Sequence, residues 1–109
     1  MDSQMNALNP IDFSILAAAS TGTTTFADAS PALVDGKVSG KTVRRFIITT
    51  ETAACRWRAD GTPATAGTGM VLAVSDTLSF TGANWKSLIS AMTFIATAST
   101  CNMSIHWFD

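Results

Sequence analysis

Apolar and polar residues alternate along much of this chain with the period of two that is typical of β-strands. Near the N-terminus, Ile11, Phe13 and Ile15 alternate with Asp12 and Ser14. The last strand is expected at 101–108. There Cys101, Met103, Ile105 and Trp107 share the inward face, and Asn102, Ser104, His106 and Phe108 share the outward face.

Several further short runs have strand character and are separated by turn-forming residues. Strands are expected at 32–34, 42–50, 53–58, 70–74, 77–81 and 92–98. The continuous apolar run 70–74 predicts burial on both faces, and Asn84 is expected to cap one helical turn through Ala91. The spacing predicts an all-β fold, an antiparallel sandwich or jelly-roll-like barrel of about seven or eight short strands. The expected core is Phe46, Ile48, Trp57, Leu72, Val74, Leu78, Phe80, Phe94, Ile105 and Trp107.

The first thirty residues differ in character from the rest. Residues 1–10 are polar and end at Asn9-Pro10, and residues 17–30 are Ala, Ser, Thr and Gly-rich with Phe26 as the one aromatic residue. A segment of this composition buries too little apolar area to hold itself in place. We therefore predict an N-terminal arm over 1–30 and a β-sandwich domain over 31–109.

The composition is poor in charge. Charged residues make up 14% of the chain and apolar residues 47%, while 16 Thr and 11 Ser stand against a single Glu. Such a surface suits a protein that works in an assembly, although an ordinary Thr-rich β domain is the alternative. A net charge of −1 and interleaved basic residues predict no nucleic-acid partner. No apolar run reaches membrane-spanning length, and the N-terminus lacks a basic signal region, so we expect no membrane partner and synthesis in the cytoplasm.

The sequence offers little catalytic chemistry. His106 is the one histidine, and it lies on the outward face of its strand without a carboxylate nearby in the sequence. The carboxylates Asp28, Asp35, Asp60 and Asp76 lie at turn-like positions, where Asp bonds to its own backbone. Gly67-Thr68-Gly69 has no following Lys-Ser/Thr and is expected to return the chain to the sheet. We expect no catalytic set, no metal and no cofactor.

The two cysteines, Cys55 and Cys101, lie 46 positions apart and do not have the spacing of a zinc site. Two buried apolar thiols are the favoured interpretation. A disulfide between them is the alternative, unusual for a cytoplasmic product.

The segment 54–63 carries the most distinctive pattern. Arg56 and Arg58 are expected to face one way from a strand and Trp57 the other, before an Asp60-Gly61 turn. Arginine is enriched at protein interfaces, so removing Arg56 or Arg58 is expected to weaken assembly more than folding, and removing Trp57 the reverse. The alternative is a core tryptophan flanked by solvated arginines. The candidate protein-interface residues are Arg44, Arg45, Arg56, Arg58, Ile11 and Phe13.

Residues 42–108 resemble small bacteriophage virion proteins. The resemblance is carried by Cys55–Met70 (CRWRADGTPATAGTGM), a Ser-Phe-Thr-Gly turn at 79–82, Met-Thr-Phe-Ile-Ala at 92–96 and the final alternating strand. It implies a non-enzymatic structural role as a capsid decoration (cement) protein. The implied partners are the major capsid protein and further copies of the chain, as a dimer or trimer, with the protein located on the capsid surface.

A second function class is open on the same residues: a head-fibre, neck or tail-surface module that binds a receptor or glycan. Exposed aromatic residues, such as Trp85 after Asn84 or the Trp107-Phe108 pair, would serve it. A small hydrolase would depend on His106 alone and is disfavoured.

Overall fold

The regular structure is built from short β-strands, as the alternation predicts. The computed structural model describes residues 9–81 and 91–109. Its strands are β1 (Pro10–Ala18), β2 (Lys37–Val38), β3 (Lys41–Thr42), β4 (Arg45–Thr50), β5 (Cys55–Arg58), β6 (Met70–Leu72), β7 (Thr77–Thr81), β8 (Thr93–Ala96) and β9 (Cys101–Phe108), with one 3-10 turn, η1 (Phe26–Asp28).

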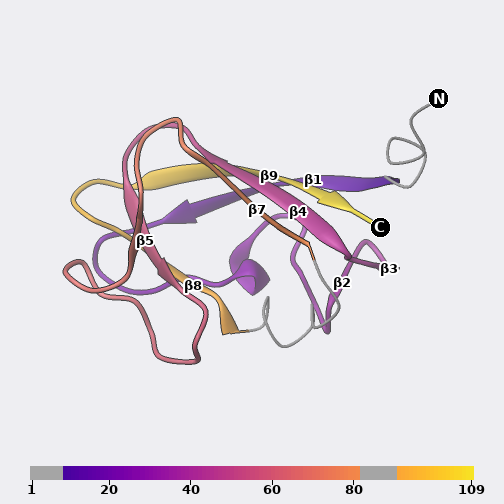
Figure 1. Ribbon diagram of the computed structural model, residues 1–109, viewed down its shortest axis with the longest axis horizontal. Coiled ribbons are helices and arrows are strands. Elements are labelled where there is room, and N and C mark those ends of the chain that lie inside the picture. The colour runs from indigo at the N-terminus through magenta and orange to yellow at the C-terminus, as the bar shows by residue number, and fades with distance from the viewer. Residues whose placement is uncertain (1–8, 82–90) are drawn as a thin grey trace.

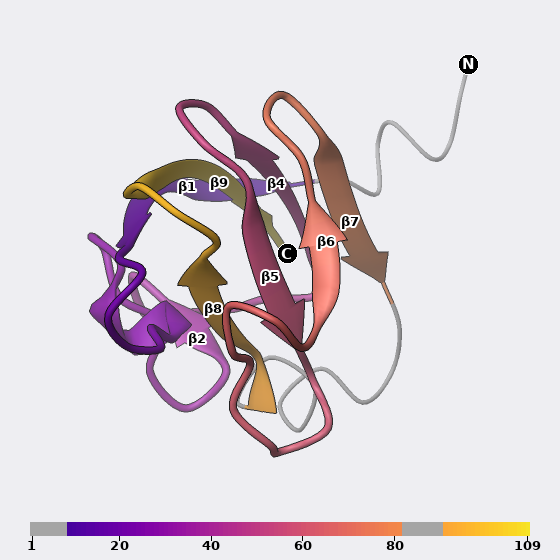
Figure 2. The same ribbon diagram turned by 90° about the vertical axis from the view of Figure 1, so that its left-hand side faces the viewer.

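The strands form two main layers. A four-stranded sheet has the order β1-β9-β4-β7, a three-stranded sheet has the order β6-β5-β8, and β2 and β3 form a separate hairpin. Every pair of neighbouring strands is antiparallel. Figure 1 shows the four-stranded sheet as one layer with β5, β8 and η1 beneath it, and Figure 2 shows β5 and β6 in front of β4 and β7. The predicted all-β, sandwich-like fold is confirmed, and the described residues do not close into a barrel.

The core is an aromatic cluster between the two layers. Phe26 lies at its centre, with ring centroids 5.3 Å from Phe46, 5.2 Å from Phe94 and 5.1 Å from Trp107. All three contacts are edge-to-face, the arrangement that aromatic quadrupoles favour. Because Phe46 and Trp107 come from the four-stranded sheet and Phe94 from the three-stranded sheet, Phe26 joins both layers.

The prediction of an arm over 1–30 is wrong for residues 10–30, which belong to the sandwich-like domain. β1 pairs with β9 from Pro10 to Ala18, and Phe26 is 1% exposed. Thr25 caps η1 with its side chain, and Asp28 bonds back to the Thr25 backbone, so a weakly apolar segment is held by a capping box. Residues 1–8 lie outside the described part of the chain.

Three predicted elements differ in detail from the observed ones. Val71 and Val74 are 55% and 48% exposed, so burial of 70–74 on both faces is wrong. Leu72 is the one buried residue of this run, because it lies beside Cys55 on the core side of the sheet, whereas Val71 lies beside Arg56 on the opposite side and Val74 follows the end of β6. Residues 32–34 are not a strand, the run 42–50 is divided between β3 and β4, and the predicted helical turn from Asn84 falls largely outside the described residues.

A buried serine decides which face of β1 points inward. The indole Nε1 of Trp107 donates a hydrogen bond of 2.6 Å to Ser14 Oγ, and the Ser14 hydroxyl donates to the Pro31 carbonyl at 2.9 Å. Ser14 is fully buried, as a partner for a buried indole N–H must be. Because side chains alternate along a strand, Phe13 and Ile15 then point to solvent and are 49% and 57% exposed.

Replacing Ser14 with alanine is expected to lower the free energy of unfolding by about 1–3 kcal/mol, because the buried indole N–H and the Pro31 carbonyl both lose their partner. Denaturant titration of the variant measures this loss. The control is Ser79→Ala, which removes an exposed hydroxyl on β7 and is expected to change stability by less than about 0.5 kcal/mol. Equal stability of the two variants would contradict the structural role of the Ser14 bond.

Candidate functional site

Two exposed apolar surfaces stand out on the described residues, one on each sheet. The first is the solvent side of the four-stranded sheet, opposite the aromatic core. We call it the outer face, and its main residues are Phe13, Ile15, Arg45, Ile47, Glu51, Ser104, His106 and Phe108. In Figure 1, β5, β8 and η1 lie beneath the four-stranded sheet, and no labelled strand forms a second layer above it.

Aromatic rings run across one end of the outer face. The His106 ring stacks on Phe108 with centroids 4.7 Å apart, and Phe13 meets His106 edge-on at 6.3 Å. His106 Nδ1 and Arg45 Nε are buried at this surface without a hydrogen-bond partner in the described part of the chain. Buried polar atoms without partners are costly and uncommon in native proteins.

The charges on the outer face lie at the two ends of β4. Arg45 begins the strand, and Glu51 follows its last residue. Glu51 accepts a hydrogen bond from the Ser104 hydroxyl on β9, which fixes its carboxylate on this face. Apolar and hydroxyl side chains occupy the strand positions between the two charges.

The second surface is the unpaired side of β6, which we call the β6 edge. Its residues are Met70 and Val71 of β6 and Val74 of the turn that follows, which are 61%, 55% and 48% exposed. β6 pairs with β5, and its other side has no strand partner among residues 9–81 and 91–109. Exposed apolar edge strands are templates for pairing with another chain, and natural proteins usually protect them with charge or bulges.

β5, the strand beside this edge, carries Arg56 and Arg58, which were expected to face a partner. The expected alternation of its side chains is present. Cys55 is buried, and Trp57 packs on the core with its ring 5.6 Å from Phe80. Arg56, however, donates to two carbonyls of its own chain, Ala66 O at 3.0 Å and Gly69 O at 2.8 Å. It therefore holds the 59–69 connection against β5.

Gly69 shows why this connection needs glycine. Its φ of 141° is one that L side chains rarely adopt, and an added Cβ would lie 3.1 Å from the Trp57 carbonyl oxygen. The expectation that the Gly67–Gly69 run serves to return the chain to the sheet is confirmed at this residue.

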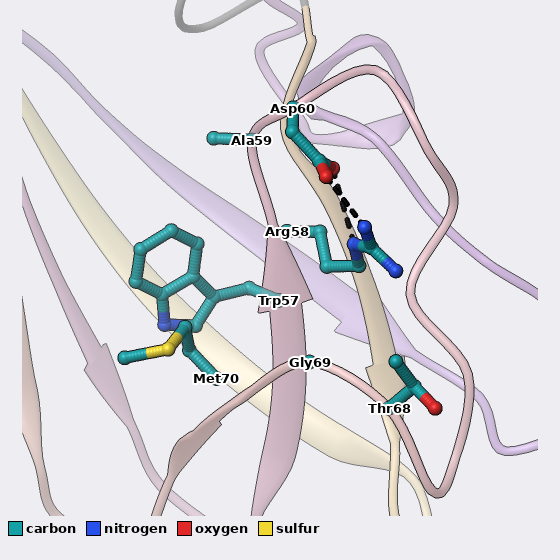
Figure 3. Close-up of a pocket in the computed structure, with 7 residues that line it drawn as sticks. All are labelled: Trp57, Arg58, Ala59, Asp60, Thr68, Gly69 and Met70. Atoms are coloured by element: carbon teal, nitrogen blue, oxygen red, sulfur yellow. Dashed lines mark hydrogen bonds and ion pairs between the residues drawn. The ribbon is translucent and has the colours of Figure 1, made fainter.

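A pocket of about 340 Å³ lies where β5 and β6 diverge, lined by Trp57, Arg58, Ala59, Asp60, Thr68, Gly69 and Met70. Arg58 bonds Asp60 through Nε at 3.1 Å and Nη2 at 2.5 Å, and this bond lowers the pKa of the Asp60 carboxyl below its usual range. Figure 3 shows this ion pair on one side of β5 and the Trp57 indole with Met70 on the other. A sugar ring stacked on the indole would therefore not meet the polar pair, and the pocket gives no specific support to glycan binding.

The titratable side chains of the described residues are spread over the molecule and do not gather into a metal-binding cluster. No group of three His, Cys, Asp or Glu side chains in them could hold a metal ion. His106 lies between two aromatic rings on the outer face. Asp12 accepts hydrogen bonds from Ser39 and from the Phe13 amide, and these bonds lower its pKa.

Both cysteines are free and fully buried, which confirms the interpretation as buried thiols. Burial raises the pKa of Cys55 to about 12, with a smaller contribution from the neighbouring Cys101 thiol, and burial also raises the pKa of Cys101. Thiols of this kind are weak nucleophiles, because the thiolate is the reactive form.

The structure separates the six residues proposed for an interface. Phe13 and Arg45 share the outer face, whereas Arg56 and Arg58 lie on the other sheet. Ile11 packs partly against the core, and Arg44 forms an exposed ion pair of 3.2 Å with Asp109. Sequence reasoning left Ile15, Ile47 and Glu51 out of the site, and strand register was the missing signal.

Replacing Arg56 with alanine is expected to lower the free energy of unfolding by about 1–2 kcal/mol, since two charge-assisted hydrogen bonds to carbonyls are lost. Hydrogen exchange should also rise across residues 59–69. Arg44→Ala, which removes an exposed ion pair, is the matched control and is expected to cost less than about 0.5 kcal/mol. Equal effects of the two substitutions would show that Arg56 does not anchor the connection.

The thiols are expected to resist labelling in the folded protein at pH 8, well below the pKa of about 12 for Cys55. Treatment with an aromatic disulfide reagent should modify neither cysteine in the native state and both after unfolding in guanidinium. Rapid labelling of either native thiol would contradict the burial described above.

In the described residues, no helix is long and apolar enough to span a membrane. No protein-family model, curated protein sequence or solved structure matches this chain.

Proposed function

We propose that this chain is a non-enzymatic structural protein of a bacteriophage virion, a capsid decoration (cement) protein that binds the assembled shell and stabilises it. The observation that carries the proposal is the β6 edge, where Met70 and Val71 on the last strand of the sheet, and Val74 just after it, expose apolar side chains. An edge of this kind is completed when a strand or apolar ridge of another protein packs on it.

The composition and the resemblance support the same role. The chain has few charged residues. Residues 42–108 resemble small phage virion proteins. A decoration protein stabilises a shell because it binds assembled subunits better than free ones, so that binding shifts the equilibrium toward the intact particle. The role requires exposed contact surfaces and no catalytic cluster.

The β6 edge also explains how the arginine-bearing segment contributes. Arg56 holds the 59–69 connection to β5 by donating hydrogen bonds to two of its carbonyls. Gly69 then makes the turn that leads into Met70 at the start of β6. In this proposal the arginines support the contact edge without touching the shell protein, and the apolar side chains of β6 contact the shell protein.

Val71→Lys is expected to weaken binding to expanded empty shells by at least about tenfold, because a lysine on an edge strand opposes pairing with another chain. Co-sedimentation with shells of the encoding phage, with the bound copies counted by gel densitometry, measures the effect. Val34→Lys is the matched control, since Val34 is 66% exposed and lies away from the β6 edge in the sequence; it should bind as the wild type does.

The wild-type protein should bind in hundreds of copies per shell and raise the temperature at which shells disrupt. Absence of co-sedimentation, or equal heat stability of shells with and without the protein, would overturn the proposal. A dozen copies or fewer per particle would favour the fibre, neck or tail role instead.

A further inference from the structure

The side chains of the outer face are arranged in rows across the sheet, and these rows are related in a way that composition alone does not reveal. Strand register places Phe13, His106 and Ile47 in one row across the sheet, and Ile15, Ser104 and Thr49 in the next row on the same face. Between them lies the inward-pointing row that contains Ile48. Two rows with different side chains thus flank one central line.

A twofold axis placed over Ile48, parallel to the face and perpendicular to the strands, exchanges these rows. It lays Phe13 of one copy over Ile15 of the partner subunit, and Ile15 over Phe13 of the partner subunit. These are the two large apolar side chains that β1 leaves 49% and 57% exposed. An isologous dimer requires this reciprocity, in which a residue and its contact exchange roles between subunits.

The same axis also matches the charges. Arg45 lies three positions before Ile48 and Glu51 three positions after it, so each Arg45 falls opposite Glu51 of the partner subunit. Within one chain the two residues are about 20 Å apart along β4 and cannot meet. The half-buried Arg45 guanidinium would then face a carboxylate of the partner subunit in place of solvent.

The size of the face is sufficient for a specific dimer. Four strands at about 4.8 Å spacing span about 19 Å, and the eight residues of β9 extend about 27 Å, so the face covers roughly 500 Å². Two copies would bury about 1,000 Å², near the lower limit for a specific interface. Sheets packed face to face cross at about 30°, which shifts the ends of facing strands sideways. The long Arg45 and Glu51 side chains can still reach each other across this shift.

We propose that the outer face is a homodimer interface, in which two copies pack face to face with their β4 strands antiparallel across a twofold axis at Ile48. One operation pairs the exposed apolar residues and the opposite charges together, whereas an unrelated partner would have to supply both sets itself. The proposal deepens the decoration role by naming a second partner, and it uses a different surface from the β6 edge.

Charge exchange tests the dimer directly. Arg45→Glu and Glu51→Arg are each expected to raise the dimer dissociation constant at least about tenfold, because like charges then face each other twice per dimer. The double variant Arg45→Glu/Glu51→Arg restores opposite charges and is expected to return the constant to within about threefold of wild type. Sedimentation equilibrium of the purified full chain over roughly 1–500 µM measures all four proteins.

Two further variants separate the interface from general effects of charge and folding. Arg44→Glu reverses a neighbouring arginine that is exposed and paired with Asp109, and it should dimerise as the wild type does. Ile15→Ser removes an exposed apolar side chain and should weaken the dimer while the circular dichroism spectrum is unchanged.

A chain that stays monomeric or forms trimers, or a double variant no better than either single variant, would overturn the proposal. If the chain is monomeric and Arg45→Glu abolishes shell binding, the occupant of the outer face is the shell protein and not a second copy. A dimer that fails to bind shells would overturn the decoration role and leave the dimer proposal standing.

Discussion

The packing of Phe26 between the two sheets is the interaction on which the rest of this structure depends. Its ring meets Phe46 and Trp107 of one layer and Phe94 of the other, all edge-to-face and all within 5.3 Å between centroids. The residue is the one large apolar side chain of a Thr- and Ala-rich segment, which backbone hydrogen bonds between Thr24 and Phe94 and between Ser30 and Ile15 also join to the domain. Without it the two small sheets would share much less apolar surface.

Trp107 imposes a second constraint through its indole N–H. The buried donor needs a partner, and Ser14 supplies it from the neighbouring strand. Once Ser14 points inward, Phe13 and Ile15 must point outward, because a strand cannot place adjacent side chains on one face. The exposed apolar character of the outer face is thus a consequence of satisfying one polar atom in the core.

The two apolar surfaces have different physical origins and fit different contacts. The β6 edge exists because a three-stranded sheet ends there, and its backbone can pair with another chain. The outer face has its strands already paired and offers side chains alone, with opposite charges at the two ends of β4. In the proposed decoration protein, the first surface suits attachment to a shell and the second suits self-association.

The sequence by itself determined the all-β class, the inward and outward faces of the last strand, and the burial of both cysteines, because these follow from a period of two within single segments. It also placed Trp57 on the side of β5 opposite Arg56. What only the tertiary structure decided were properties that depend on neighbours. Residues 10–30 belong to the domain because β9 and the aromatic cluster bind them, and Met70, Val71 and Val74 are exposed where the three-stranded sheet ends, while Leu72 between them is buried. The outer face could not be read from the chain, since its rows come from strands distant in sequence and are aligned by register alone.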